Sequence, residues 1–298
     1  MHEKRFLFRC FFCHHTKEAF EMKHPIRRFA ALLLALMLTA GAALARTQPL
    51  NILLIGVDNP DEYENGRSDT MILVRADSDG GRVRMVSFLR DLYVPIPDHG
   101  SNRLNAAYTF GGEELLKQTL YESFGVAVDR TATVHFSLLA QLVDALGGIE
   151  LEITEKERQE LNSLLPKGES EVASAGWQWL NGTQTLCYTR IRKLDSDFQR
   201  TQRQQEVLSA MLDRSADIGY WDLLELAVST LSNIRTDLKL GDMLDLLPIV
   251  TKLQELDLES ARVPFDGTYQ DETINGMMVL KPDLEPIRKQ LNDFLYGE

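Results

Sequence analysis

The sequence predicts an α/β fold in which helices cover a mixed β-sheet. Short apolar runs rich in branched residues alternate with segments of helical periodicity, and two neighbouring runs carry a hairpin signal. Of the 298 residues, 44% are hydrophobic and 26% are charged. This composition is close to the globular average and excludes a disordered or fibrous chain. No repeat, low-complexity tract or linker divides residues 47–298, so we expect them to form a single domain.

Residues 1–46 have the order of features that is typical of a targeting segment. A basic stretch begins at Met22, the predicted true start, and an apolar run at 29–38 follows before small residues reach Ala45. The uncharged stretch is at the lower limit of length for crossing a bilayer. Both a single N-terminal membrane anchor and secretion after cleavage near Ala45 therefore stay open. Either one places the body on the extracytoplasmic face of the cell membrane or beyond it.

The body of the chain is acidic. Residues 1–46 hold 8 basic and 3 acidic side chains, which leaves 24 basic and 41 acidic ones in residues 47–298. Because non-specific binding of nucleic acid depends on a basic face, we expect no nucleic-acid partner. Cys10 and Cys13 form a CxxC that lacks the second pair of a structural zinc site. Cys187 is the single cysteine of the body, so its fold is predicted without an intrachain disulfide.

The first half of the body alternates strands and helices. Strands are predicted at 50–57, 69–76 and 82–89, and the turn-forming residues 77–81 join the last two into a hairpin. A helix is predicted at 112–124, with Gly125 as its stop. The next predicted elements are a strand at 132–136, a helix at 137–146 and a strand at 149–153.

The second half is predicted to be mainly helical. Residues 154–180 are polar and are predicted to be an irregular excursion over the surface. Helices are predicted at 202–216, 221–234, 240–256 and 283–296, with a short return to the sheet at 260–265. The predicted fold therefore has a helical C-terminal portion.

Two carboxylates stand at predicted strand ends. Asp58 follows the first strand, and Asp69 begins the second directly after Arg67 and Ser68. If the loop between them folds back, both carboxylates share one oxygen-rich site. Magnesium is commonly held by one or two carboxylates together with waters and substrate phosphates. The alternative is that Asp58 is a turn residue and Asp69 a cap.

Arginines are concentrated in the same acidic body, and five of its 24 basic side chains lie between Arg190 and Arg203. Arg190 and Arg192 alternate and so project to one face of an extended segment, while Arg200 and Gln204 share a helix face. The planar fork of arginine binds phosphate oxygens bidentately, which favours a phosphate site. The alternative is a solvated basic face, or ion pairs with Asp195 and Asp197.

Seven segments appear in an order that resembles the LytR-CpsA-Psr family over about residues 49–215. They are NILLIGVD at 51–58, RSDTMILV at 67–74, SFLRDLYVPIP at 87–97, RLNAAYTFGG at 103–112, LVDALGGIEL at 142–151, LNGTQTLCYTRIR at 180–192 and DFQRTQRQQ at 197–205. Two positions depart from the family pattern: Gln199, where glycine is frequent, and Arg130, where an aromatic residue is common.

The resemblance implies a three-layer α/β/α sandwich with a mixed central β-sheet. It also implies an extracytoplasmic, membrane-attached, Mg²⁺-dependent phosphotransferase of mostly Gram-positive bacteria. Such an enzyme moves a glycopolymer, such as teichoic acid or capsule, from a polyprenyl-pyrophosphate carrier in the membrane lipid to a peptidoglycan acceptor. One alternative is a lipid pyrophosphate hydrolase that uses the same site. Another is a DNA-binding transcriptional attenuator, which export and the acidic body both oppose.

Site residues follow from the resemblance position by position. The implied metal ligands are Asp58 and Asp69. The implied pyrophosphate contacts are Arg67, Arg90, Arg103, Arg190, Arg192, Arg200 and Gln204. The implied catalytic residues are Arg90, Asp91, Arg190 and Arg192. The candidate lining of an apolar lipid pocket is Val134, Phe136, Leu139, Leu142, Val143 and Leu146, although core positions share the same pattern.

Asp91 has two possible roles: a base for the incoming hydroxyl, or an ion-pair partner that orients Arg90. We favour the second, because a carboxylate near several cations stays ionised as their ion-pair partner and is then a weak base.

Overall fold

The computed structural model describes residues 49–57, 66–77, 82–192, 197–216, 218, 234–239, 241–242, 246 and 257–297. The predicted targeting segment lies outside these residues, and so does almost all of the predicted helices at 221–234 and 240–256. None of the helices in the described ranges has the length and apolar character needed to cross a membrane.

Six strands of the described residues form one mixed sheet in the order β10-β3-β2-β1-β6-β9. Their bounds are β1 Leu50–Val57, β2 Ser68–Asp77, β3 Arg82–Phe88, β6 Arg130–His135, β9 Arg235–Thr236 and β10 Asp257–Val263. β1 pairs antiparallel with β2 and parallel with β6. β3 pairs antiparallel with β2 and parallel with β10. The predicted mixed sheet and its hairpin are confirmed.

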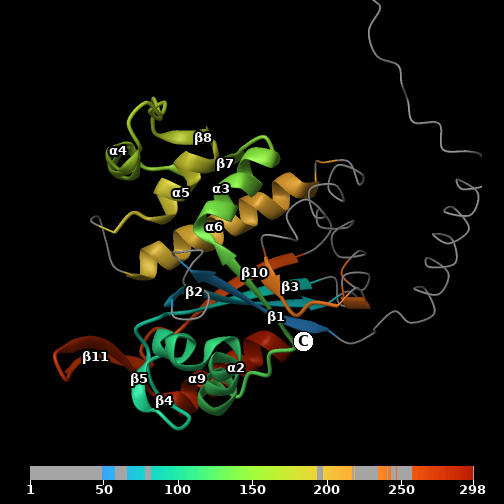
Figure 1. Cartoon of the computed structure of the whole chain (residues 1–298), viewed down its shortest axis with the longest axis vertical. Helices are drawn as coiled ribbons and strands as arrows, with labels where there is room; N and C mark the ends of the chain where they lie inside the picture. The colour runs from blue at the N-terminus through green and yellow to red at the C-terminus, as the bar shows by residue number, and fades with distance from the viewer. Residues whose placement is uncertain are drawn as a thin grey trace, which may run out of the picture. The chain divides into compact units, whose positions relative to one another are not determined.

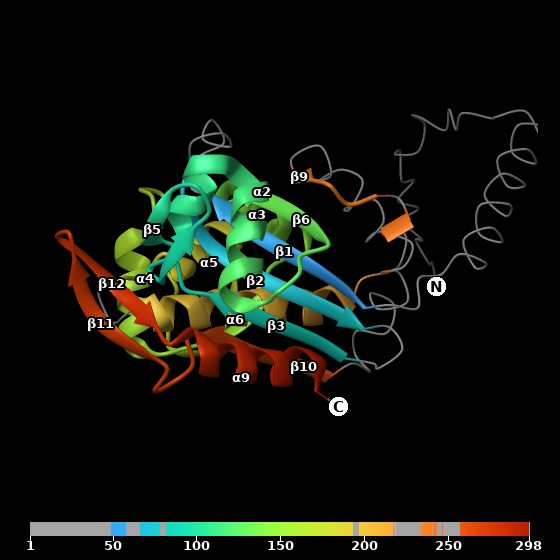
Figure 2. The same ribbon diagram turned by 90° about the horizontal axis from the view of Figure 1, so that it is seen from below.

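Helices cover both faces of this sheet, so the predicted three-layer sandwich is confirmed (Figure 1). One outer layer holds α2 Asn105–Phe124 and α9 Leu284–Tyr296, with the hairpins β4 Tyr93–Ile96 to β5 Gly100–Arg103 and β11 Tyr269–Ile274 to β12 Met277–Pro282. Figure 2 views the molecule from this side. The opposite layer holds α3 Phe136–Ala145, α4 Glu155–Leu164, α5 Gly182–Thr189 and α6 Asp197–Ala216, with the ribbon of β7 Ile149–Ile153 and β8 Gly176–Leu180.

The main core lies between the sheet and the α2–α9 layer. Alternate residues of β1, Leu53, Ile55 and Val57, are fully buried and pack in one cluster with residues of α2 and α9. A second cluster joins β7, α4, α5 and α6 around the buried Tyr188. α5, which leads into Arg190 and Arg192, and α6, which carries Arg200 and Gln204, are therefore held by a core of their own.

The prediction of an irregular excursion at 154–180 is wrong. Helix α4 begins there because Thr154 and Glu157 form a reciprocal capping box: the Thr154 hydroxyl accepts from the Glu157 backbone N–H, and the Glu157 side chain accepts from the Thr154 N–H. Further along, β8 pairs antiparallel with β7. The polar composition of α4 reflects its position on the surface, where Leu161 is its buried residue.

The helical C-terminal portion is confirmed for α6 and α9, but residues 257–282 form strands. β10 completes an edge of the central sheet, at the predicted return. The hairpin β11–β12 was not predicted. Its turn contains Asn275 at φ 52° and Gly276 at φ 78°, the left-handed pair that an Asn-Gly hairpin turn requires.

The C-terminal helix is tied to the sheet by a buried arginine. Arg84 of β3 donates to the carbonyls of Leu295 and Gly297, both at 3.0 Å, and its Nε lies 2.9 Å from a Glu259 carboxylate oxygen. These bonds satisfy carbonyls that the end of α9 leaves without helical partners. Asn51 of β1 also donates to the Tyr296 hydroxyl at 3.3 Å.

Gly182 fixes the distance between α3 and α5. Its N–H donates to Asp144 at 2.7 Å, and a Cβ at this position would lie 2.0 Å from the Ala140 carbonyl oxygen. We expect Gly182→Ala to lower the free energy of unfolding by about 1–3 kcal/mol, because the backbone at Ala140 must move to relieve this contact. Thermal melting measures the loss. Gly241→Ala is the matched control, since a Cβ there meets nothing within 4 Å. Equal melting temperatures for the two variants would contradict this account.

Candidate active site

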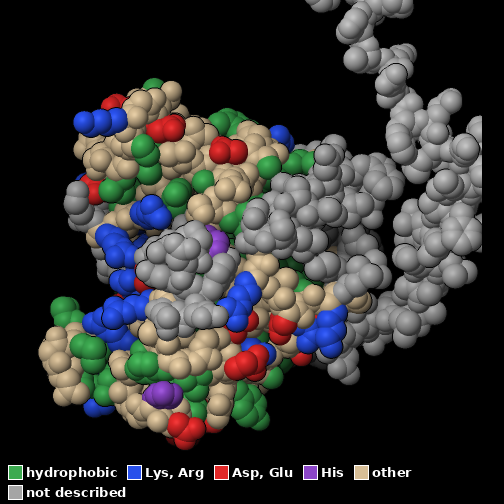
Figure 3. Space-filling model, viewed as in Figure 1, with side chains coloured by type: hydrophobic (Ala, Val, Ile, Leu, Met, Phe, Trp, Pro, Cys, Tyr) green, Lys and Arg blue, Asp and Glu red, His purple; other side chains and the backbone are tan. Residues whose placement is uncertain are grey.

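Arginines from three separate segments converge on Asp69, at the start of β2. The Asp69 Oδ1 accepts from Arg90 Nη1 at 2.7 Å, and its Oδ2 lies 3.4 Å from Arg192 Nη2. Arg200 Nη2 lies 3.4 Å from the Asp69 carbonyl oxygen. Figure 3 shows Lys and Arg side chains gathered along one side of the molecule, between the α3–α6 layer and the hairpins of the other layer. The structure thus concentrates positive charge locally on an acidic body.

Asp91 links two more guanidinium groups to this cluster. Its Oδ2 lies 3.7 Å from Arg90 Nε, and its Oδ1 lies 3.3 Å from Arg103 Nη1. Arg103 also donates to the Met278 carbonyl at 2.6 Å. Asp91 therefore sits between two cations, the geometry expected of a residue that orients Arg90.

The backbone around Arg90 is held on both sides. The Leu89 N–H donates to the Val263 carbonyl at 2.9 Å, and the Arg90 carbonyl accepts from the Asn105 N–H at 3.2 Å. The loop after β3 is thus attached to both β10 and the start of α2. These bonds fix where the Arg90 side chain begins.

Two residues of α6 that the sequence analysis did not assign to the site hold the helix in place. Gln205 donates to the Ser87 hydroxyl and to the Ala261 carbonyl, both at 2.8 Å, and so attaches α6 to β3 and β10. Arg203 donates to Glu157 at 2.8 Å and to the carbonyl of Ile191, the neighbour of Arg192, at 3.3 Å. The sequence signal for both was their place in the motif that contains Arg200.

The remaining predicted phosphate contacts lie next to this cluster in the chain. Arg67 precedes Asp69 by two residues and is exposed, and Arg190 ends α5 and is also exposed. Gln204 is half-buried on α6. Arg200 is 3% exposed, so a solvated helix face does not describe it. Asp195 and the Asp197 side chain lie outside the described residues.

One of the two predicted metal ligands can be assessed. Asp58 lies outside the described residues. Asp69 offers a carboxylate that is 11% exposed and whose Oδ2 lies 3.4 Å from Arg192 Nη2. One carboxylate suits Mg²⁺ when substrate phosphates supply further oxygens. Within the described ranges, no group of three or more Asp, Glu, His or Cys side chains is placed to hold a metal ion.

The predicted lipid-pocket residues lie on β6 and along α3. Val143 and Leu146 are buried, and Val143 belongs to the second core cluster. Val134, Leu139 and Leu142 are half-buried, and the Phe136 side chain lies outside the description. For Val143 the contacts indicate an ordinary core role, whereas the lipid-facing role of the set stays a prediction.

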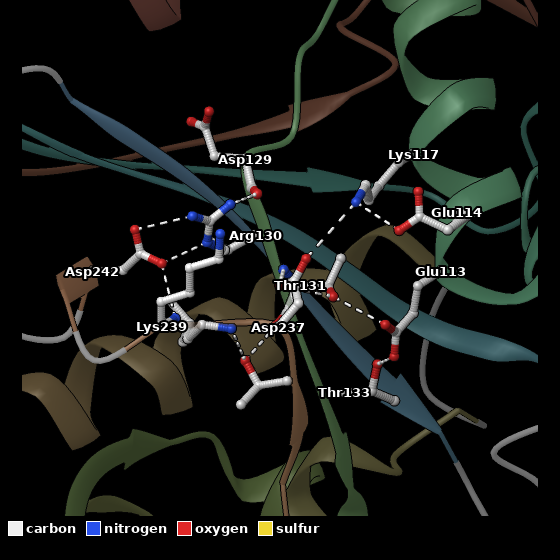
Figure 4. Close-up of polar contacts among 12 residues, drawn as sticks. Glu113, Glu114, Lys117, Asp129, Arg130, Thr131, Thr133, Asp237, Lys239 and Asp242 are labelled. Atoms are coloured by element: carbon white, nitrogen blue, oxygen red, sulfur yellow. Dashed lines mark hydrogen bonds and ion pairs between the residues drawn. The ribbon is translucent and has the colours of Figure 1, made fainter.

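Arg130, the position where the family commonly has an aromatic residue, takes part in a polar network at the edge of the sheet (Figure 4). It donates to Asp242 at 2.5 and 3.2 Å, and this hydrogen bond raises the pKa of the Arg130 guanidinium. Next to it, the Thr131 N–H donates to Asp237, while the hydroxyls of Thr131 and Thr133 donate to Glu113 of α2. Arg130 therefore helps to attach the segment 235–242 to β6.

Named proteins resemble this chain over most of its length. The polyisoprenyl-teichoic acid–peptidoglycan teichoic acid transferase TagT of Bacillus subtilis is 32% identical over 252 residues, which cover 82% of this chain and 76% of TagT. TagU of Enterococcus faecalis, a transferase of the same description, is 30% identical and covers 75% of this chain and 74% of its own length.

Solved structures agree with this likeness. TagT bound to LIIa-WTA superposes with a TM-score of 0.70 at 30% identity, covering 83% of this chain and 91% of that one. YwtF (TagT) with bound octaprenyl pyrophosphate lipid has a TM-score of 0.65 at 28% identity, covering 85% and 92%. The sequence also matches the LytR_cpsA_psr family over residues 10–293. The sheet order, the ordered motifs and these matches together show that the chain belongs to the LytR-CpsA-Psr family.

Proposed function

We propose that this chain is a phosphotransferase that moves a glycopolymer from a polyprenyl-pyrophosphate carrier to peptidoglycan, at the extracytoplasmic face of the cell membrane. The observation that carries the proposal is the convergence of Arg90, Arg192 and Arg200 on Asp69. Its support is that relatives matched over 76% and 74% of their own length are named teichoic acid–peptidoglycan transferases, and that one related structure holds a prenyl pyrophosphate.

The arginines carry the chemistry in this proposal. An acceptor hydroxyl forms a bond to the phosphorus next to the polymer, the bond from that phosphorus to the prenyl phosphate breaks, and the hydroxyl proton passes to solvent. Negative charge grows on the leaving prenyl phosphate as that bond breaks. Guanidinium groups already held in place stabilise this charge without further reorganisation. Asp69 and Asp91 orient them through the contacts described above.

Magnesium belongs to the same proposal. Asp69, together with Asp58, would hold Mg²⁺, and the ion would neutralise phosphate charge. The Asp69 carboxylate then has two tasks: it orients Arg90 through Oδ1 and would serve as a ligand of the metal.

The test uses the full chain with a lipid-linked polymer donor, with and without peptidoglycan. We expect radiolabelled polymer to become attached to peptidoglycan, with little release of polymer phosphate when no acceptor is present. Chelation of divalent ions should abolish transfer, and added Mg²⁺ should restore it. Release of polymer phosphate at the same rate with and without acceptor would instead identify a lipid pyrophosphate hydrolase. Full transfer activity in excess chelator would contradict the proposed requirement for Mg²⁺.

A further inference from the structure

A pair of tryptophans, Trp177 and Trp179, belongs to strand β8 of the ribbon β7–β8. This ribbon lies on the outer side of the α3–α6 layer (Figure 1). Trp177 is 63% exposed and Trp179 is 56% exposed, and these are two of the three tryptophans in the sequence. Their cross-strand partners are Glu152 and Glu150, so these four side chains share one face. All four are exposed, whereas on the opposite face Ile149, Leu151, Ile153 and Leu180 are buried. We call this surface the tryptophan face.

The tryptophan face is held in place by the core that packs against the reverse side of the ribbon. Ile149, Leu151 and Leu180 on the reverse side of the ribbon belong to the second core cluster. The Arg214 guanidinium lies 5.5 Å from the centre of the Trp179 ring and is itself held by the Leu146 carbonyl at 3.1 Å. Two large apolar rings exposed next to each other on one rigid face form the kind of patch that marks a binding surface.

The side chains around the rings select the kind of ligand. Flat aromatic faces offer apolar area with few rotatable bonds, which suits stacking against the C–H faces of sugar rings. Glu150 and Glu152 accept hydrogen bonds from hydroxyl groups and repel anions. The two carboxylates outnumber the nearby cation of Arg214, so a phosphate polymer and an anionic lipid surface are disfavoured. The ligand that fits is an uncharged polysaccharide rich in hydroxyl groups.

We propose that the tryptophan face binds a glycan strand of uncharged N-acetylated sugars, the class that forms the backbone of peptidoglycan. β8 leads within two residues into α5, and Arg192 follows that helix. A helix of eight residues spans only about 12 Å, so a strand of a few sugars bound at the face can extend toward the arginines. That this strand is the acceptor rests on the proposed function, whereas glycan binding itself does not.

The experiment titrates the full chain with N-acetylglucosamine oligomers and follows tryptophan fluorescence, with sedimentation on insoluble peptidoglycan as a second measurement. We expect Trp177→Ala and Trp179→Ala each to weaken binding, and the double variant to weaken it about tenfold or more, with an unchanged melting temperature. Tyr121→Ala is the matched control, because Tyr121 is 61% exposed but lies on α2 in the opposite layer. If the double variant melts early, the two single variants supply the comparison.

Three results would overturn the proposal: no glycan binding by the unmodified chain, equal loss in Tyr121→Ala, or tryptophan-dependent binding to phosphatidylglycerol vesicles instead of glycan. In the donor assay, the double variant should transfer less polymer to peptidoglycan while its acceptor-independent release of polymer phosphate stays unchanged. Tryptophan-dependent glycan binding by a chain that turns over no donor would support the tryptophan face and contradict the proposed function.

Discussion

Replacing Arg90 or Arg200 with alanine is expected to slow polymer transfer about 30- to 1000-fold, the usual cost of removing one preorganised donor from a developing anion. Arg90 and Arg200 reach Asp69 from the loop after β3 and from α6, and both are largely buried. Each contact to the leaving phosphate strengthens as charge develops, so the loss appears mainly in the chemical step. The measurement is the initial rate of label transfer at saturating donor.

Stability must be measured alongside these rates. The arginine cluster contains the carboxylates of Asp69 and Asp91, so its cations are partly neutralised even without substrate. Removing Arg90 leaves Asp69 without a 2.7 Å partner, and we expect a loss of about 1–3 kcal/mol in stability. Arg158→Ala on α4 is the control, because the hydrogen bonds of Arg158 are with Glu155 and the Val172 carbonyl and involve neither Asp69 nor Asp91. Near-normal transfer by folded Arg90→Ala and Arg200→Ala would show that these arginines have a structural role only.

Arg203→Ala is expected to lower the free energy of unfolding by up to about 3–5 kcal/mol, the cost for a fully buried pair, because it leaves a half-buried carboxylate without its cation. Arg203 is 3% exposed, and its Nε lies 2.8 Å from Glu157 Oε1, in a carboxylate whose side chain is 16% exposed. Urea unfolding at neutral pH measures the effect. The double variant Arg203→Leu, Glu157→Leu should lose less than Arg203→Ala, since it buries no unpaired charge. A larger loss in the double variant would refute this explanation.

The same pair predicts how the effect depends on pH. Burial by itself would raise the pKa of Glu157, but hydrogen bonds from Arg203 and Thr154 outweigh it and hold this pKa below its ordinary value of 4.5. A lowered pKa in the folded state stabilises the protein above pH 4.5, and this contribution is lost as the pH falls further, through the folded-state pKa. The difference between Arg203→Ala and the unmodified chain should therefore shrink in acid. A constant difference across that range would show that Glu157 is not the cause.

The sequence predicts the central strands well because they are buried. A continuous run of branched apolar residues, such as residues 50–57, is typical of a strand that is buried on both faces in the middle of a sheet. β11 was missed for the opposite reason: its residues are mostly polar and exposed, so no apolar alternation marks it. α4 is polar as well, and the capping box of Thr154 and Glu157 was the available signal.

The candidate site could also be predicted from the sequence only in part. Residue type and motif order indicate which side chains matter, but not which of them meet. Asp69 is an example, because the metal role assigned to it does not predict its contacts with Arg90 and Arg192, which lie 21 and 123 residues away in the chain. Such pairings depend on how β2, β3 and α5 are arranged in space. Arg203 was equally unpredictable, since its burial depends on where α4 lies.

The bonds that hold α9 have a consequence for the timing of folding. Arg84 and the carbonyl of Leu295 are 211 residues apart, and Asn51 and Tyr296 are 245 residues apart. Contacts between residues so far apart in the chain form only after a large loop has closed. The entropy lost in closing that loop precedes any stabilisation by the contact, and this slows folding. In a chain exported as proposed, residue 295 must have crossed the membrane before the core beneath α9 can close. Until then the chain exposes the apolar face of the sheet that α9 finally covers.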